Sequence, residues 1–272
     1  MCKVLNVSRS SYYKYLSKKP CKRELENQMI ESKILYIYTV SKKRYGSPKI
    51  NKALQELGIN ISLKRTQRIM RRMGIKSIII KKYRPTSSKN KVMEKENILK
   101  RDFSTNTINE KWVTDITYIY TIKDGWCYLA SVMDLHTRKI IGHSMSKYID
   151  TKLALQAVKN ALKLQKPTNS LIIHSDIGCQ YTSLGFKEYI FNTKIITHSF
   201  SGKGCTYDNA SIESYHASLK KEEVHLVTYY DFTAAKLAIF EYIESWYNRI
   251  TIHSSIGYIS PQRCEDLARK IS

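Results

Sequence analysis

Apolar residues recur at helical spacing through residues 1–80. Two segments there predict a helix-turn-helix-like pair, because each opens with a residue that caps or starts a helix and closes with glycine. One runs from Ser47–Pro48 to Gly58, and the other follows Ser62 and stops at Gly74. Two earlier helices are predicted for SRSSYYKYL and for the apolar series Leu25, Ile30, Ile34 and Tyr38. This region is therefore expected to form a small, all-helical domain.

From residue 109 the pattern changes to runs of β-branched and aromatic residues separated by short turns. Three strands are predicted first, and helices and strands then alternate. The predicted elements are strands at 111–122, 126–134 and 139–146, a helix at 151–164, a strand at 171–174, a helix around 184–191, a strand at 194–197, a helix from Asp208 and a helix at 232–246. This order indicates an α/β core with a mixed sheet over residues 109–228, which residues 229–272 complete.

Two stretches lack periodicity. Residues 81–108 are basic and polar, and they are predicted to link the two regions. Two interpretations of this linker stay open, namely a segment that follows a phosphate backbone and a disordered connection. The second stretch, Ser199 to Tyr207, is rich in Gly and Ser and predicts a mobile loop.

The composition favours a polyanionic partner. Lys and Arg total 46 against 23 Asp and Glu, which gives a formal net charge of +23. Clustered cations gain affinity for nucleic acid by releasing counterions from the phosphate backbone. No apolar run approaches the roughly 18 residues needed to span a bilayer, and the first residues do not begin a signal peptide. We therefore expect a cytoplasmic protein without membrane contact, whose six scattered cysteines are reduced thiols.

The second helix of the predicted pair has a basic side. Its cations are Lys64, Arg65, Arg68, Arg71 and Arg72. One interpretation is docking on DNA, with this helix in or across a groove; the other is an ordinary solvated, charged face. Acidic residues are nearly absent from this segment, which favours DNA contact. Base-specific readout is not expected.

Three acidic residues stand out in the core. Asp115 lies within the predicted strand WVTDITYIY, where burying an ionised group without a partner costs free energy. Asp176 follows the apolar strand 171–174 and precedes a turn at Gly178, and Glu213 lies on a predicted helix. None of the three has an obvious cationic partner in the sequence. Since Mg²⁺ sites are usually built from a few carboxylates plus substrate phosphates, the acids predict a site for a hard divalent cation.

Five segments, taken in order, resemble one known family. They are WVTDITYI, YLASVMDLHTRKIIG, HSDIGCQYTS, GKGCTYDNASIESYHASLKKE and HSSIGYISP. This pattern is similar to that of the second-frame protein (OrfB) of the IS-three family of bacterial insertion-sequence transposases, which carry a retroviral-integrase-like core. The resemblance implies a ribonuclease-H-like fold for the core. Because that fold hosts several chemistries, the function must rest on the site.

The resemblance also assigns the three acids. The family's catalytic and metal-binding Asp, Asp and Glu correspond to Asp115, Asp176 and Glu213. One residue more than is usual in the family separates the last two acids, and it is assigned to the loop before Ser199. The family's DN-x-x-x-E pattern, which begins here at Asp208–Asn209, favours Glu213 as the third acid, and Asp208 is interpreted as the helix cap.

The reaction that the resemblance implies is metal-dependent phosphoryl transfer. Two Mg²⁺ ions, for which Mn²⁺ would substitute, would support strand cleavage at the element ends and transfer of the 3′-hydroxyl to another DNA strand. The implied partners are insertion-sequence and target DNA in the nucleoid, the first-frame protein by frameshift fusion or association, and further copies in a multimer on DNA. The main alternative is a non-catalytic DNA-binding or regulatory fragment of a frameshift-fused transposase. A ribonuclease-H-type nuclease acting on hybrids ranks last.

Further residues match family positions with less specific roles. Lys220 corresponds to a DNA-contacting lysine of related integrases and is predicted to contact a phosphate. His174 either orients the site or ends a strand, and Asp134 is interpreted as structural. The family's C-terminal YN-x-x-R-x-H motif has Thr251 at its Arg position, and Arg249 is the nearest spatial substitute. The matching members of that motif are Asn248 and His253.

Overall fold

The computed structural model describes residue 4 and residues 7–17, 21–78, 96–202 and 206–271. The chain divides by its internal contacts into two units, residues 1–78 and 79–272. Most of the predicted linker, residues 81–95, lies outside the described residues. Within the described ranges, no helix is long and apolar enough to cross a membrane.

The described part of the first unit is helical, as predicted. Its elements are α1 (Arg9–Leu16), α2 (Lys22–Val40), α3 (Ser47–Glu56) and α4 (Leu63–Arg72). The Ser62 hydroxyl caps α4 by accepting a hydrogen bond from the Arg65 N–H at 3.2 Å. Gly46 takes the cap position of α3, so Ser47 is the first helical residue and not the cap. The local signals thus located both helices of the pair.

Buried aliphatic residues hold α2, α3 and α4 together. They are Ile30, Ile34, Ile37, Ile50, Leu54, Ile69 and Met70. Leu25, which belongs to the predicted apolar series, is exposed. A polar contact inside the unit was not predicted: Asn51 Nδ2 donates to Ile61 O and to Thr66 Oγ1, both at 2.9 Å. Because these groups are buried and satisfied, they fix α3 against the start of α4.

The second unit contains a five-stranded sheet in the order β3-β2-β1-β4-β5. The strands are β1 (Lys111–Thr121), β2 (Gly125–Asp134), β3 (Ile140–Ser146), β4 (Leu171–Ser175) and β5 (Ile196–Phe200). The first three are antiparallel, whereas β4 runs parallel to β1 and β5 parallel to β4. The predicted mixed sheet is therefore confirmed, and β1 lies at its centre.

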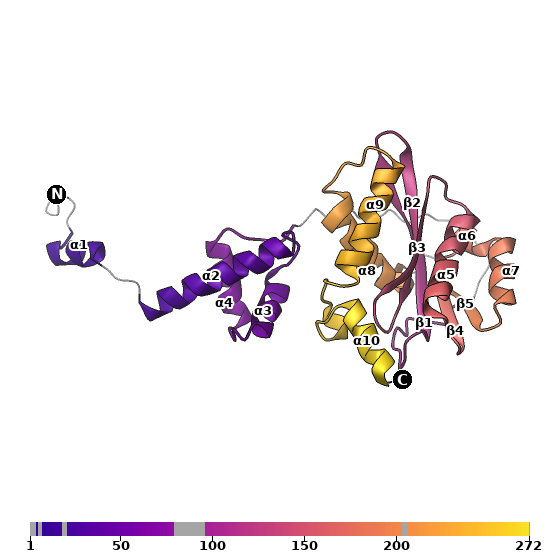
Figure 1. The fold of residues 1–272 in the computed structure, drawn as a ribbon, viewed down its shortest axis with the longest axis horizontal. Helices are drawn as coiled ribbons and strands as arrows, with labels where there is room; N and C mark the ends of the chain where they lie inside the picture. Colours follow the sequence, from indigo (N-terminus) through magenta and orange to yellow (C-terminus); the bar gives the residue numbers. More distant parts are fainter. Residues whose placement is uncertain (1–3, 5–6, 18–20, 79–95, 203–205, 272) are drawn as a thin grey trace. The chain divides into compact units, whose positions relative to one another are not determined.

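Helices cover both faces of the sheet (Figure 1). One face carries α5 (Thr151–Gln165), α6 (Cys179–Thr182) and α7 (Leu184–Asn192); the other carries α8 (Ala210–Leu219) and α9 (Phe232–Glu241). Alternate residues of β1 point to opposite faces. Trp112 packs in the apolar core beneath α5, whereas Asp115 contacts His216 of α8. The strand alternation thus directs the first acid toward the α8 face.

Residues 96–108, which are predicted as part of the linker, pack on the core within the second unit. Leu99 is buried, and the N–H groups of Ile98 and Leu99 donate to Ser199 Oγ at 3.0 and 3.1 Å. The Phe200 N–H in turn donates to Glu96 O at 3.1 Å. This part of the predicted linker therefore runs against β5.

Three elements differ from the predictions. β5 begins at Ile196 and extends to Phe200, so the predicted mobile loop from Ser199 starts too early. The short α6 follows Gly178 directly and was not predicted. A further helix, α10 (Pro261–Ile271), closes the described chain where no helix was predicted.

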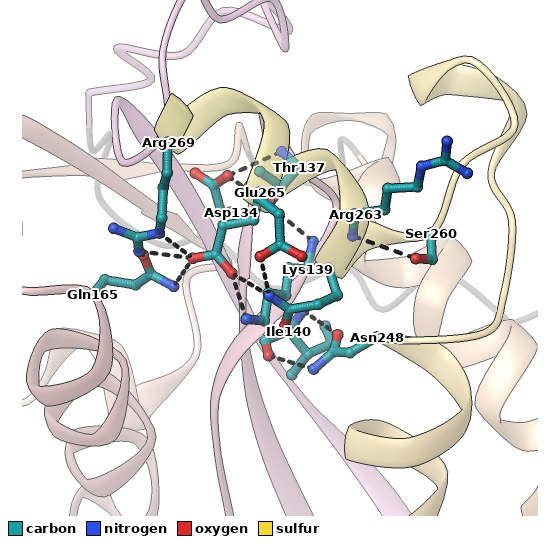
Figure 2. A network of polar contacts seen from close by, with 12 residues as sticks. Asp134, Thr137, Lys139, Ile140, Gln165, Asn248, Ser260, Arg263, Glu265 and Arg269 are labelled. Carbon is teal, nitrogen blue, oxygen red and sulfur yellow. Dashed lines mark hydrogen bonds and ion pairs between the residues drawn. The ribbon is translucent and has the colours of Figure 1, made fainter. Parts of the chain in front are cut away.

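A buried carboxylate anchors α10 to the sheet and to α5 (Figure 2). Glu265 accepts hydrogen bonds from Lys139 Nζ at 2.5 Å, Gln165 Nε2 at 2.8 Å and Arg269 at 2.8 Å. Burial alone would raise the pKa of Glu265, but these donors lower it below its ordinary value. The helix that was not predicted is therefore fixed by charge pairing.

Candidate active site

Two of the three acids lie at the same level on neighbouring strands. The parallel ladder between β1 and β4 ends at the pair Thr114–Ser175. Asp115 is the next residue of β1, and Asp176 directly follows the last residue of β4. The topology therefore brings together two aspartates that are far apart in the sequence, at the carboxyl end of β4.

Asp176 is followed by a turn in which glycine leaves room for the carboxylate. The Gly178 N–H donates to Asp176 Oδ1 at 3.1 Å. A Cβ atom at this position would lie 3.0 Å from that oxygen and 3.0 Å from Gln180 Oε1, tighter than ordinary contact. Gly178 has a φ of −66°. The close approach, and not a left-handed backbone, therefore favours glycine here.

Glu213 lies in the first turn of α8 and is exposed. Asn209 precedes this helix, and its Nδ2 donates to Thr114 O at 3.3 Å, one residue before Asp115. Ile212 is fully buried beneath the helix. These contacts hold the start of α8, which carries the third acid, against the strand that carries the first.

The three carboxylates act on one another electrostatically. Loss of surrounding water and the negative charge of Asp115 raise the pKa of Asp176 to about 6. Loss of water, then Asp115 and Asp176, also raise the pKa of Glu213. Among the residues that the structure describes, neither Asp176 nor Glu213 forms a salt bridge with Lys or Arg. Negative charge is therefore concentrated at these two residues without an ion pair to Lys or Arg among the described residues.

This set of oxygen donors fits a divalent cation. Carboxylates are hard ligands, and a bound cation would relieve the repulsion that raises the pKa values. In the described ranges, no three His, Cys, Asp or Glu side chains are close enough to form a complete metal-binding cluster. The carboxylates thus influence one another without forming a closed ligand shell.

Lys220 follows α8 in the π-helical turn Lys220–Val224. Partial burial lowers the pKa of its ammonium group, while the negative charge of Asp115 acts in the opposite direction. This influence shows that Lys220 lies within electrostatic reach of the acids. Its predicted contact with a DNA phosphate stays a prediction.

The prediction that Asp208 caps the Glu213 helix is wrong. Its carboxylate instead accepts hydrogen bonds from Arg101 Nε at 2.6 Å, Asn97 Nδ2 at 2.8 Å and the Gly202 N–H at 2.7 Å. Burial would raise the pKa of Asp208, but Arg101 and Gly202 lower it below its ordinary value. Asp208 therefore ties the segment before β1 to the loop that precedes α8.

His174 is fully buried in β4, one residue before the strand ends. Nδ1 lies 2.9 Å from Ser199 Oγ, and Nε2 lies 3.1 Å from Ser201 Oγ. Burial lowers its pKa to about 4. The imidazole therefore links β4 to β5 and to the residue that follows it.

Residues of the other matched motifs hold the fold. Asp134 is buried and accepts hydrogen bonds from the N–H and hydroxyl of Thr137, as its structural interpretation predicts. Asn248 both accepts from and donates to the backbone of Ile140 at 3.0 Å. Thr251 is buried whereas Arg249 is exposed. Arg249 therefore lies outside the buried surroundings of Thr251, and its role as a substitute stays a prediction.

The basic residues of α4 fall into two groups. Arg65 donates to two residues of α2, Glu26 at 2.9 Å and Asn27 at 3.0 Å. Arg72 pairs with Glu31, which also lies on α2. The exposed cations without a salt bridge to any described residue are Lys64, Arg68 and Arg71. The acidic residues of α2 thus neutralise part of the basic side that the sequence analysis predicts.

Two side chains beside the acids were not predicted. His216 contacts Asp115, and Asn209 bonds the strand that carries it. The spacing of His216, three residues after Glu213 on one helix, is visible in the sequence. The contact of His216 with Ser131 depends on the register between β1 and β2. Local patterns in the sequence do not give that register.

Family profiles match most of both units. Two profiles of an integrase core domain match residues 106–205 and 213–266, and a profile of an HTH-like domain matches residues 24–83. The chain is therefore an integrase-core protein with an HTH-like domain before the core, which confirms the predicted fold class.

Two solved structures are similar to parts of the chain. The catalytic core domain of HTLV-2 integrase in complex with magnesium is 18% identical, with a TM-score of 0.44 over 58% of this chain and 97% of that one. The simian T-cell lymphotropic virus intasome in complex with PP2A regulatory subunit B56 gamma is 13% identical, with a TM-score of 0.46 over 85% and 74%.

Curated relatives cover almost the whole chain. The transposase InsF for insertion sequence IS3A of Escherichia coli (strain K12) is 36% identical over 98% of this chain and 93% of the relative. An uncharacterized 31 kDa protein of insertion element IS600 from Shigella sonnei is 33% identical over 96% of each chain. The chain therefore belongs to the IS-three family of insertion-sequence transposases, as its five motifs predict.

Proposed function

We propose that this protein is a polynucleotidyl transferase that cleaves DNA at the ends of an insertion sequence and joins the 3′ ends to new DNA. The observation that most supports this is the group of three carboxylates from β1, the end of β4 and α8. Loss of water and then the neighbouring acids raise the pKa values of Asp176 and Glu213. Family membership supplies the substrate class, because the relative InsF is a transposase for an insertion sequence.

Asp115, Asp176 and Glu213 would hold two Mg²⁺ ions, and Mn²⁺ would substitute. Bound metal would activate the attacking hydroxyl and stabilise the leaving oxygen of an in-line displacement. The chain presents the carboxylates from secondary structure: Asp115 from the central strand and Glu213 from a helix fixed to that strand through Asn209. Lys220 would contact a phosphate beside the acids.

The helical unit would bind DNA through the basic side of α4. Lys64, Arg68 and Arg71 would supply most of the phosphate contacts. Arg65 and Arg72 would add less, because each is already bonded to α2. The active form would be a multimer on element and target DNA in the bacterial cytoplasm, with the first-frame protein fused or associated.

The test is strand cleavage and joining with Mg²⁺ or Mn²⁺ on labelled DNA from the element's own ends. Wild type is compared with Glu213→Gln, which removes one negative oxygen donor and keeps the side-chain shape. We expect the variant to lose at least a hundredfold in rate, which corresponds to about 2.7 kcal/mol of transition-state stabilisation. The matched control is Glu188→Gln, since Glu188 is an exposed glutamate of α7.

The protein fused to the first-frame product extends the test to the regulatory alternative. Cleavage by the fusion but not by this chain would mean that the acids are competent but the polypeptide is incomplete. DNA binding without cleavage by either form would favour a non-catalytic regulator. Equal rates for wild type and Glu213→Gln would contradict the assignment of the third ligand.

A further inference from the structure

A buried histidine contacts the first acid of the site. His216 lies on α8, three residues after Glu213, and is only 5% exposed. Its Nδ1 is 3.3 Å from Asp115 Oδ2, and its Nε2 is 3.4 Å from Ser131 Oγ. The antiparallel register pairs Asp115 with Ser131. The imidazole therefore lies over two residues that face each other across the central strands.

The two contacts define what each ring nitrogen does. A carboxylate oxygen can only accept, so Nδ1 carries the hydrogen and donates to Asp115. Nε2 lies beside the Ser131 hydroxyl, which can either donate or accept. Both ring nitrogens therefore have a partner. His216 is consequently turned toward the carboxylate and is not available as a metal ligand itself.

Asp115 is held at both of its oxygens. The Ile116 N–H donates to Oδ1 at 2.8 Å, and His216 contacts Oδ2. Asp176 accepts one hydrogen bond, from Gly178, and Glu213 has no hydrogen bond from any described residue. Each oxygen of Asp115 keeps a further lone pair for another partner. Asp115 is thus the acid whose orientation is set before any ligand arrives.

We propose that His216 is a positioning residue, which fixes the Asp115 carboxylate in the orientation that receives a divalent cation. This inference rests on the proposed function. A histidine hydrogen bond to a ligating carboxylate restrains its rotation, so the free energy of metal binding does not include the cost of ordering it. Because His216 shares α8 with Glu213, the same contact also sets the helix against the strand.

Three substitutions separate positioning from packing. His216→Asn retains a donor close to the place of Nδ1, whereas the longer His216→Gln places its amide nearer Nε2 and so restores only the Ser131 contact. His216→Phe keeps an aromatic ring and removes both contacts. The matched control is His225→Gln, since His225 is an exposed histidine beyond the π-helical turn.

The primary readout is Mn²⁺ binding to the full chain by isothermal titration calorimetry in the absence of DNA. Losses of 10- to 100-fold are typical when a partner of a metal ligand is removed, and we expect at least about tenfold for His216→Gln and His216→Phe. His216→Asn should stay within about threefold of wild type, and His225→Gln should match it. Thermal unfolding in EDTA should be similar for His216→Asn and His216→Gln, so a difference in Mn²⁺ affinity between these two variants does not come from packing.

Wild-type affinity in His216→Gln, or equal losses in His216→Asn and His216→Gln, would overturn the proposal. An EDTA melting temperature that falls in proportion to the loss of affinity would do the same, because it would show a packing role. If His216→Phe fails to fold, the Mn²⁺ affinities of His216→Asn and His216→Gln still test the proposal. Failure of the proposed function is distinct: wild type and Asp115→Asn would then both fail to bind Mn²⁺ and to cleave DNA.

Discussion

Glu265 and the three acids of the candidate site show two opposite treatments of carboxylates in one unit. Glu265 is buried, and Lys139, Gln165 and Arg269 surround it with donors (Figure 2). Its pKa is lowered, despite the opposing effect of burial. The pKa values of Asp176 and Glu213 are raised, by loss of water and by their acidic neighbours.

The difference separates a carboxylate that holds the fold from carboxylates that are ready for a cation. A buried ion pair that loses one partner leaves an uncompensated charge, so every member of the Glu265 network is constrained by the others. Acids that repel one another make the fold less stable until a cation binds, which is why perturbed pKa values concentrate at functional sites. Charge pairing, more than burial, therefore distinguishes the two groups.

The largest loss of stability is expected when the charge of Glu265 is removed from its network with Lys139, Gln165 and Arg269. Glu265→Gln should lower the free energy of unfolding by about 3 kcal/mol, because Lys139 would keep a buried charge without its counter-ion. Asp176→Asn should cost less than about 0.5 kcal/mol, since it removes repulsion at an exposed position. Urea unfolding of both variants in EDTA measures the contrast, and equal losses would contradict it.

A double variant sharpens this result. Lys139→Met combined with Glu265→Leu removes both charges and keeps apolar volume, so it should be more stable than Glu265→Leu alone. If the double variant is the less stable one, then the packing of these side chains matters more than their pairing.

Local signals in the sequence predict the elements that carry the site, but not the contacts between them. Ser62 as a cap and the strands before Asp115 and Asp176 depend on neighbours in the chain, and the structure confirms them. Asp208 was misassigned because its partner Arg101 is 107 residues away. A helix cap is predicted from the next few residues alone, so the distant contact with Arg101 could not be taken into account.

The missed helix α10 shows the same limit in another form. Pro261 at its first position is a local start signal. However, Glu265 is anchored by Lys139, which is 126 residues away. The three acids could be proposed from the sequence because the motif fixes their order along the chain. The imidazole of His216 between Asp115 and Ser131 needed strand register and helix placement together, which only the folded chain supplies.

Metal binding should stabilise a variant of the candidate site and a variant of the Glu265 network to different extents. At a Mg²⁺ concentration a hundred times its Kd, wild type should gain about 2.7 kcal/mol of stability by mass action. Asp176→Asn should gain far less, because it lacks one ligand, whereas Glu265→Gln should gain as much as wild type from its lower baseline. Thermal unfolding across a Mg²⁺ titration, with Ca²⁺ as a second hard cation, measures this. An equal gain in Asp176→Asn would place the cation elsewhere.

The smallest effect on stability is expected from a change in pH. A rise in pH should reduce the contribution of Asp176 to stability and increase that of Glu265. Asp176 has a folded pKa of about 6 against an ordinary value of 3.8. Its contribution to stability is therefore full below about pH 3.8 and is lost as the pH rises through 6. Glu265 has a folded pKa below its ordinary 4.5, so its contribution is present above pH 4.5 and is lost as the pH falls through the lower folded value.

Melting temperatures in EDTA from pH 3 to 7 test both signs. The melting temperature of Asp176→Asn minus that of wild type should increase between pH 4 and 6 and then level off. The increase should be less than about 2 °C, because the exposed carboxylate is screened by water. The deficit of Glu265→Gln should instead shrink below pH 4.5. A difference for Asp176→Asn that decreases over the same interval would mean that the site carboxylates are compensated in the folded protein, and the contrast with Glu265 would then fail.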